Sequence, residues 1–596
     1  MKPLPVKSEL PISTPQPRPS SKLLTKRIVL AVVLSLLALV HLVNPQLLFP
    51  DQLTLPLRFQ EGLRGDESLL DDVSDQRTLR FGEYLDQEGP RIAIIGAGAG
   101  GSSAAYFLRH FSALTSRNLS TQVTIYESSD YVGGRSTVSW PWLNDPYSPP
   151  PYSGFEEEEE VEPIELGASI FVSVNKNLEK AVRIFGLNTT DYDGEDGETG
   201  IWDGEKFVFK EKGNGNWWTK AKLLWRYGRS PFKVKDLVKA CVESFTTLYT
   251  RPFITSPSFP FTSYLNFSAS LSLLSPASST GSDFFGEQSI SPLFTSELIS
   301  AATQVNYGTP IDQIHGLGAL VSLAANGAKS VVGGNRKIFE EFVGRSQAKL
   351  KLKTKVKEIV KLSEEGEKRS KWVVRTETGQ DGGVYDAVIL AAPFHQSSIS
   401  IPHLSTSSIP PPQPYVSLHV TLVLTNASTP LSSYFSLSPK STVPNTIFST
   451  FSTSSSSKPR FNSLNYLKRL PSTISAKFDP CNGERAVVHV VKLFSKEELS
   501  EVELEGIFGK DNVLKKVEKV WNSYPRLDLI TSGKELAGIR LDEDGGLYYV
   551  NGMERLISTM ETETVSAYNV VSLVMKDLFG YRPPLSWAEW GERKSN

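Results

Sequence analysis

The chain has 596 residues, which is enough for several domains, and its 39% hydrophobic content excludes wholesale disorder. Its 63 Lys and Arg residues nearly balance its 65 Asp and Glu residues, so net charge gives no reason to expect a nucleic-acid partner. Only two cysteines occur, Cys241 and Cys481, which excludes a disulfide scaffold, a four-cysteine zinc site and an iron–sulfur cluster. One disulfide stays open, and no histidine spacing predicts a metal site.

The N-terminal segment predicts the compartment. Residues 1–27 form a basic tail, and an uncharged apolar run follows at 28–43. Its length lies between the apolar core of a secretory signal and a membrane-spanning helix, but residues 47–49 extend it and no A-x-A-like cleavage site follows. We therefore favour a retained signal anchor at 28–49, with the basic tail in the cytosol, over a cleaved signal peptide. The body is then expected in the lumen of the secretory pathway or outside the cell.

The sequence also predicts a linker, glycosylation sites and surface insertions. Residues 50–88 are polar and predict the linker. Four N-x-S/T sequons agree with a lumenal body, at Asn118, Asn188, Asn266 and Asn426. Three stretches are rich in Pro or Ser and are interpreted as surface insertions: 140–162, which contains a run of glutamates at 156–160, then 256–291, and finally 402–414 together with 452–458.

The strongest chemical signal is a glycine motif between a strand and a helix at 91–111. Gly96, Gly98 and Gly101 give G-x-G-x-x-G after a buried strand and before apolar residues at helical spacing. In such a turn the first glycine permits the bend, the second lets the backbone approach a pyrophosphate, and the third lets helix and strand pack closely. A second strand ends in Glu127, whose carboxylate is suited to ribose hydroxyls. The sequence therefore predicts a Rossmann-type dinucleotide site.

A second glycine loop indicates which dinucleotide binds. Gly133, Gly134 and Arg135 follow Glu127 after a short spacer, and the arginine is expected to lie along a diphosphate. Nicotinamide enzymes ordinarily lack this loop, so FAD is favoured over NAD. Residues 350–360 alternate like one strand, which would place the backbone near Val356 against the adenine.

Two late segments complete the expected cofactor site. Residues 385–393 predict a buried strand that ends in a turn of small residues, and residues 545–571 predict a glycine turn followed by a helix. The N-terminal amides of that helix would point at the flavin or its phosphates. This brings Gly552 and Glu561 into the predicted FAD-binding set.

Longer motifs carry a family resemblance. They are ELGASIF (165–171), GIWDGEKFVF (200–209), KLLWRYG (222–228), QVNYGT (304–309), VGGNRKIF (332–339) and YYVNGMERLISTMETETVSAYNV (548–570). Together they resemble the prenylcysteine oxidase, or prenylcysteine lyase, family within the flavin amine oxidase-like group. The glycine loops occur in many flavoproteins, whereas KLLWRYG, VNYG and YY-x-NG-x-E point to this family.

The resemblance implies an FAD-dependent oxidase that degrades the remains of prenylated proteins. It would cleave farnesyl- or geranylgeranyl-cysteine to a prenyl aldehyde, free cysteine and hydrogen peroxide, with oxygen as second substrate and a vacuole or lysosome as the expected organelle. Because the flavin carries the difficult step, no catalytic side chain is assigned. His315, His395, His419 and Tyr549 are interpreted as structural residues. No protein partner is predicted.

The expected fold class is α/β, with a discontinuous Rossmann-type FAD-binding domain, an inserted α+β substrate domain and one N-terminal hydrophobic anchor helix. The FAD-binding domain is placed at 89–200, 325–400 and 525–582, the substrate domain at 201–324 and 401–524, and a tail at 583–596. Segments 217–250 and 293–325 are expected to be helical, and the resemblance implies that they line an apolar slot. Two other functions stay open: a flavin amine oxidase or desaturase-like oxidoreductase, and an anchored, non-catalytic lipid-binding protein.

Overall fold

The computed structural model describes residues 89–114, 121–148, 161–191, 198–212, 223–325, 327–362, 370–379, 381–452, 455–456 and 458–581. The predicted basic tail, anchor, linker and C-terminal tail, the sequon at Asn118 and the glutamate run at 156–160 lie outside these residues. Within the described ranges, no helix has the length and apolar character needed to cross a membrane.

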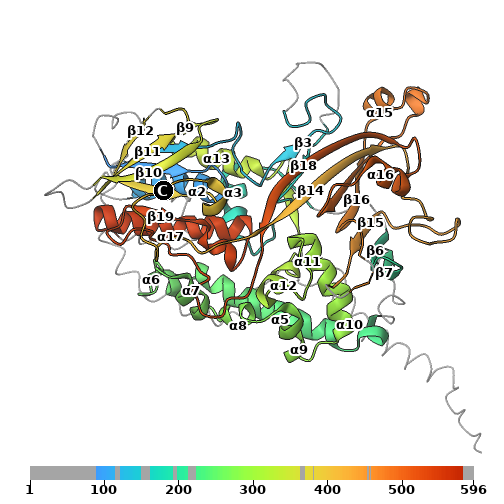
Figure 1. Ribbon diagram of the computed structural model, residues 1–596, viewed down its shortest axis with the longest axis horizontal. Helices are drawn as coiled ribbons and strands as arrows, with labels where there is room; N and C mark the ends of the chain where they lie inside the picture. The colour runs from blue at the N-terminus through green and yellow to red at the C-terminus, as the bar shows by residue number, and fades with distance from the viewer. Residues whose placement is uncertain are drawn as a thin grey trace, which may run out of the picture.

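A five-stranded parallel sheet forms one end of the molecule, at the left of Figure 1. Its strand order is β19 (Leu547–Tyr549), β13 (Ala387–Leu390), β1 (Arg91–Ile95), β2 (Gln122–Tyr126) and β9 (Lys349–Lys351). These strands come from segments that are far apart in the sequence. The Rossmann-type strand, glycine turn and helix predicted at 91–111 are confirmed, because β1 leads directly into α2 (Ala99–Leu114).

Both faces of this sheet are covered. On one face lie α2, α3 (Lys176–Phe185), α13 (Arg336–Ser346) and α17 (Met560–Phe579), which share a hydrophobic core with the alternate residues of the strands. On the other face lies a three-stranded antiparallel sheet of β10 (Val356–Leu362), β11 (Lys371–Thr376) and β12 (Asp381–Tyr385). A parallel sheet that is buried on both sides needs apolar residues at every position, which the fully buried β13 shows.

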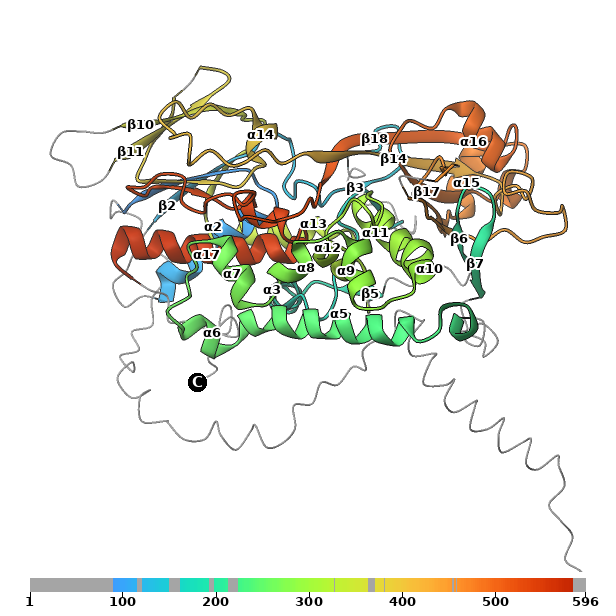
Figure 2. The ribbon, with the colours of Figure 1, turned by 60° about the horizontal axis from the view of Figure 1, so that its bottom comes forward.

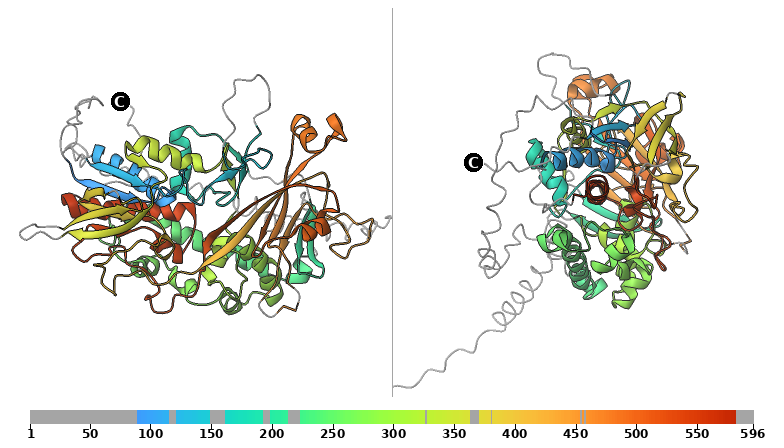
Figure 3. Two further views of the ribbon diagram at one scale, coloured as in Figure 1. Left: turned by 45° about the horizontal axis from the view of Figure 1, so that its top comes forward. Right: turned by 90° about the vertical axis from the view of Figure 1, so that its left-hand side faces the viewer.

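A second sheet of seven strands extends toward the other end of the molecule (Figures 1 and 3). Its order is β18 (Val513–Pro525), β14 (Tyr415–Thr425), β17 (His489–Ser495), β16 (Ser463–Arg469), β15 (Thr446–Ser449), β6 (Glu198–Trp202) and β7 (Phe207–Lys212). Neighbouring strands are antiparallel except β15 and β6. The long strands β14 and β18 belong to this second sheet. Their ends at Tyr415 and Ser523 contact residues of the Rossmann-type region, so these two strands connect the two parts of the molecule.

A layer of helices lies under both sheets along the lower edge of Figure 2. It contains α5 (Ser230–Thr246), η6 (Thr247–Tyr249), α6 (Arg251–Thr255), α7 (Tyr264–Ser270), α8 (Leu274–Ala277), α9 (Gly281–Glu287), α10 (Pro292–Phe294), the π-helix η7 (Thr295–Ile299), α11 (Ser300–Tyr307) and α12 (Gly316–Ser322). The helices predicted at 217–250 and 293–325 are therefore present over most of their described length.

Short elements connect these layers. They are β3 (Val138–Ser139), β4 (Ile164–Glu165), β5 (Thr189–Asp191), β8 (Lys329–Val331), α14 (Phe394–Ser397), α15 (Ser472–Phe478), η8 (Gly483–Arg485), α16 (Glu501–Phe508) and η9 (Asn551–Arg555). β3 pairs with β4, and β5 pairs with β8, both antiparallel.

The structure contradicts the surface-insertion prediction for residues 256–291 and for the start of 140–162. Residues 256–291 are not a surface insertion, because their aromatic side chains Phe259, Phe261, Tyr264, Phe267 and Phe285 are buried in the helical layer. The high Ser and Pro content hid this apolar face, although burying each aromatic side chain contributes on the order of 2 kcal/mol. Trp140, at the start of another predicted insertion, is also buried.

The strand predicted at 350–360 is two strands in different sheets. β9 ends at Lys351 and β10 begins at Val356, and the turn between them contains Lys353 in the left-handed region with φ 51°. Apolar alternation alone does not show a turn made of ordinary residues, so the break could not be read from the pattern.

Candidate active site

A cavity of about 1650 Å³ runs from the two glycine loops to the helical layer. Ligand pockets usually measure roughly 300–1,000 Å³, so this space is large enough for a cofactor and a substrate together. Its walls come from the Rossmann-type sheet, the seven-stranded sheet and the helical layer, which explains why the sequence motifs that line it are so widely separated.

The first glycine loop forms one end of the cavity. Gly96 has φ 105°, and a Cβ there would lie 2.5 Å from the carbonyl oxygen of Ala391. A Cβ at Gly101 would overlap the carbonyl oxygen of Gly96, so this glycine allows α2 to pack against β1. At Gly98, by contrast, the nearest atom to an added Cβ is the Cα of Gly134 at 3.9 Å. The loop therefore keeps Gly98 open toward the cavity at the N-terminus of α2, a site suited to a pyrophosphate.

Glu127 follows β2 and joins the first loop to its surroundings. One carboxylate oxygen accepts a hydrogen bond from the N–H of Ala97 at 2.8 Å, and the other accepts one from the N–H of Ser129 at 2.7 Å. The residue is buried but lines the cavity. This leaves a fixed, oriented acceptor where the sequence predicts contact with ribose hydroxyls.

The second glycine loop lies against the first. Gly98 and Gly133 form an isolated parallel bridge, and the N–H of Gly133 donates to the carbonyl of Ala97 at 2.9 Å. Gly133 and Gly134 both have positive φ, and a Cβ at Gly134 would lie 3.1 Å from the Cα of Gly98. The two glycine loops thus form one cradle, which agrees with the prediction that both contact the diphosphate of the cofactor.

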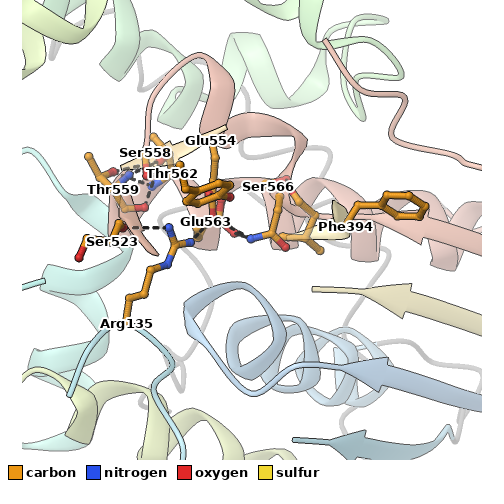
Figure 4. A network of polar contacts seen from close by, with 12 residues as sticks. Arg135, Phe394, Ser523, Glu554, Ser558, Thr559, Thr562, Glu563 and Ser566 are labelled. Atoms are coloured by element: carbon orange, nitrogen blue, oxygen red, sulfur yellow. Dashed lines mark hydrogen bonds and ion pairs between the residues drawn. The ribbon is translucent and has the colours of Figure 1, made fainter. Parts of the chain in front are cut away.

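Arg135 lines the cavity but is engaged by protein groups (Figure 4). It forms an ion pair with Glu554 and donates to the carbonyl of Ser523 at 3.3 Å. Glu554 also accepts from the hydroxyl of Tyr415 and from the side-chain amide of Asn551. Arg135 therefore neutralises a buried carboxylate at the cavity wall, in addition to any role toward a diphosphate.

Glu563 adds a second buried carboxyl group to this cluster. Burial, together with the negative charge of Glu554, raises the pKa of the Glu563 carboxyl well above its usual value, and Arg135 only partly opposes this. One of its oxygens accepts from the side-chain amide of Asn551 at 3.1 Å. Sequence reasoning did not find Glu554 and Glu563, although both lie in segment 548–570. The ion pair of Glu554 with Arg135 joins residues more than four hundred positions apart, and Asn551 links Glu563 to it.

The N-terminus of α17 also reaches the cavity. The helix begins after Thr559, which forms a capping box with Thr562, and Met560 and Glu561 line the wall. The Glu561 carboxylate accepts from the N–H groups of Asn177 and Leu178 and from the hydroxyl of Tyr249. Glu561 thus ties α17 to the start of α3.

Of two further residues predicted to bind FAD, Val356 lines the cavity and Gly552 does not. Val356 begins β10 and lines the cavity beside Thr354 and Lys355, as predicted for a backbone contact with adenine. Gly552 does not line it, because a Cβ there would lie 2.5 Å from the ring of Tyr264 inside the core. Gly552 allows η9 to pack closely and would act on a cofactor only through its neighbours.

Buried polar atoms without partners indicate a polar ligand. Among the described residues, atoms on the cavity wall that lack a hydrogen-bond partner are Glu165 Oε2, Tyr466 Oη, Trp521 Nε1, Ser523 Oγ, Asn551 Oδ1 and Glu563 Oε1. Such atoms are normally satisfied in folded proteins. Those of Ser523, Asn551 and Glu563 lie around the Arg135–Glu554 pair, where they fit a dinucleotide with many donors and acceptors.

The far part of the cavity is an apolar arm. The helical layer contributes Leu223, Val234, Val238, Phe294, Leu298 and Leu320 to it. The KLLWRYG motif explains part of this wall, because Leu223 lines the arm while Arg226 and Tyr227 bind Glu297 in the π-helix. The arm is the observed counterpart of the apolar slot that the resemblance implies.

The three histidine candidates and Tyr549 have structural partners and lie away from this cavity, whereas Cys241 lines it. His315 caps α12, since its Nδ1 accepts from the N–H of Gly318, and burial lowers its pKa to about 4. His395 contacts the carbonyl of Pro410, His419 contacts Glu518, and the Tyr549 hydroxyl accepts from the N–H of Phe394. Cys241 and Cys481 are free thiols. No cluster of metal-ligand side chains occurs in the part of the chain that is described.

Comparison with known proteins gives a consistent result. A family model described as prenylcysteine lyase matches residues 210–582, and one described as an NAD(P)-binding Rossmann-like domain matches residues 94–185. The chain belongs to the prenylcysteine lyase family. It is 27% identical to farnesylcysteine lyase of Arabidopsis thaliana, over 83% of this chain and 90% of that protein. It is also 27% identical to human prenylcysteine oxidase 1, over 81% of this chain and 88% of that protein.

Solved structures support the fold. A putrescine oxidase is 14% identical with a TM-score of 0.50, covering 82% of this chain and 99% of that one. A cyclohexylamine oxidase from Brevibacterium oxydans has the same TM-score and covers 82% of this chain and all of that one. This similarity shows a common α/β architecture with a Rossmann-like domain, as the sequence predicted.

Proposed function

We propose that the protein is an FAD-dependent thioether oxidase that cleaves farnesyl- or geranylgeranyl-cysteine to a prenyl aldehyde, cysteine and hydrogen peroxide. The observation that carries the proposal is one continuous cavity with a glycine cradle at one end and an apolar arm at the other, in a chain of this family. Relatives named farnesylcysteine lyase and prenylcysteine oxidase align over most of the chain.

The chain's own residues would hold the cofactor in a defined orientation. Gly98 and Gly134 leave room for the pyrophosphate at the N-terminus of α2, Glu127 accepts from ribose hydroxyls, and the backbone near Val356 meets the adenine. FAD, when bound, accepts a hydride from the carbon beside the sulfur. The N-terminus of α17 reaches the same cavity and would offer partial positive charge to a bound flavin.

The rest of the cavity would position the substrate. The apolar arm takes the isoprenoid chain, which aligns the thioether with the cofactor end and restricts water to the amount that the reaction consumes. Water adds to the oxidised carbon, the carbon–sulfur bond breaks, and oxygen takes up the two electrons and two protons as hydrogen peroxide. None of these steps requires a histidine or cysteine at the site.

An absorbance spectrum of the purified protein, followed by anaerobic addition of farnesylcysteine, tests the proposal. The protein should be yellow, and farnesylcysteine should bleach it without oxygen. S-alkyl cysteines with saturated chains should not, because they lack allylic stabilisation of the developing cation. A colourless protein would favour the non-catalytic lipid-binding alternative. Bleaching by amines but not by farnesylcysteine would favour an amine oxidase.

We also propose a retained N-terminal anchor, a lumenal glycosylated body and a vacuolar or lysosomal location. The exposed positions of Asn188 and Asn266 support glycosylation, whereas Asn426 is only partly exposed. Protease added to sealed microsomes should remove only a short tail, and glycosidase should shift the protected body. Digestion of the body from the cytosolic side would refute the orientation.

A further inference from the structure

One charged side chain in the cavity wall has no role in the cofactor cradle or in the apolar arm. Lys492 lies in β17 on the same side of the strand as Val490 and Phe494, and only 3% of it is exposed. It lines the cavity, as does Asn465, its cross-strand partner in β16. Partners in register project to the same face, so a lysine and an asparagine lie side by side on this wall.

The Lys492 ammonium has hydrogen bonds but lacks a close charge partner. Its nitrogen donates to the backbone oxygen of Glu165 at 3.1 Å and to the Ser169 hydroxyl at 3.4 Å. In the described ranges no carboxylate oxygen lies within 4.0 Å of this nitrogen. Burial lowers the pKa of the ammonium to about 8, and the Glu165 carboxyl only partly opposes this. A buried cation is costly unless it is paired, so an anionic ligand would relieve this cost.

The position of Lys492 is next to the cofactor cradle. Its two acceptors, Glu165 and Ser169, flank Gly167, where a Cβ would overlap the carbonyl oxygen of Arg135 in the second glycine loop. Farther along the same sheet, beyond β16, strands β15 and β6 carry Phe448 and Ile201, which line the cavity with apolar surface. Lys492 therefore lies between the polar and the apolar parts of the wall.

We infer that Lys492 binds the carboxylate of the amino-acid part of the substrate, an inference that rests on the proposed function. A cysteine thioether has an apolar chain that fits the arm and a carboxylate that needs a cation once it leaves water. An N–H of the ammonium, with the Asn465 amide beside it, supplies charge-assisted hydrogen bonds to that carboxylate. Anchoring both ends of the substrate places the carbon beside sulfur at the cofactor end.

The test compares S-farnesylcysteine with S-farnesylcysteamine, which is the same thioether without the carboxylate. Flavin-loaded full-length protein is mixed rapidly with each thioether without oxygen, and each dissociation constant is taken from the dependence of the flavin reduction rate on thioether concentration. We expect wild-type protein to bind the acid about tenfold more tightly than the amine. Lys492→Met should abolish this preference by weakening binding of the acid alone, and Lys492→Arg should retain part of it.

A matched control separates this effect from damage to the sheet. Lys516 on β18 pairs with Glu498 and Glu518 and does not line the cavity, so Lys516→Met should leave both constants unchanged. An unchanged preference in Lys492→Met, or equal weakening of both ligands, would overturn the inference. So would loss of the preference in Lys468→Met instead, since Lys468 is another lysine of the cavity wall. Failure of the proposed function would differ, because neither thioether would then bleach the wild-type flavin.

Discussion

Replacing Gly98 with alanine should remove the cofactor without unfolding the protein. The added Cβ has Gly134 Cα at 3.9 Å as its nearest neighbour, which is ordinary van der Waals contact. Gly98 also has no positive φ, so alanine fits its backbone conformation. The free energy of unfolding of the apoprotein should therefore change by less than about 1 kcal/mol.

The same methyl group occupies the approach of the pyrophosphate to the backbone. Two backbone hydrogen bonds to a charged phosphate contribute roughly 1.5–3 kcal/mol each, so losing both costs about 3–6 kcal/mol. That loss corresponds to roughly 10²- to 10⁴-fold weaker cofactor binding. The purified variant should be nearly colourless.

The assay measures the ratio of flavin to protein absorbance and the thermal unfolding midpoint of the apoprotein. Gly101→Ala provides the opposite control, because its Cβ overlaps the Gly96 carbonyl and should destabilise the fold itself. Gly344→Ala lies on the exposed side of α13 with no atom near the added Cβ, so it should leave the flavin content unchanged and raise stability slightly through helix propensity. Full flavin content in Gly98→Ala would refute the placement of the cofactor. A loss of stability as large as in Gly101→Ala would refute the geometric reasoning.

Three other predictions test the electrostatics and the shape of the cavity. Burial raises the pKa of Glu165 from 4.5 to about 8. Between these two pH values the folded state holds a proton that the unfolded state has released. The free energy of unfolding should therefore fall by a few kcal/mol as pH rises from about 4.5 to about 8. Glu165→Gln should flatten this dependence of the unfolding midpoint, and an unchanged slope would contradict it. Arg135→Met leaves the Glu554 carboxylate without its cation and should cost about 3–5 kcal/mol, most of which Glu554→Gln in the same chain should restore. Val238→Phe should fill part of the apolar arm. The KM for farnesylcysteine should then rise about tenfold while the flavin content stays unchanged. An unaltered KM would mean that the isoprenoid chain binds elsewhere.

The local parts of the cofactor cradle were readable from sequence. Gly96, Gly98 and Gly101 are each required by a short-range constraint, namely a bend, an open backbone and a close helix contact. Such constraints act within one strand–turn–helix unit, so they leave a pattern of fixed spacing. The same holds for Glu127 at the end of the next strand. The family motifs added the expectation of an apolar slot, which the helical layer provides.

Amino-acid composition did not predict which segments are buried where Ser and Pro content was high. The Ser- and Pro-rich residues 256–291 were expected on the surface, but their aromatic side chains, such as Phe259 and Phe267, form part of the core. Likewise, alternation across 350–360 did not reveal that β9 and β10 belong to different sheets. In both cases the deciding interaction is with another segment, which a local pattern does not contain.

By itself, the sequence determined the Rossmann-type unit, the dinucleotide cradle and the family, because these depend on residues close together in the chain. Tertiary structure alone decided which charges meet. It paired Arg135 with Glu554, placed Glu563 beside them, and turned Lys492 toward the cavity next to Ser169. Burial and long-range contact determine the pKa and the partners of such groups, and both arise only when distant segments are packed together.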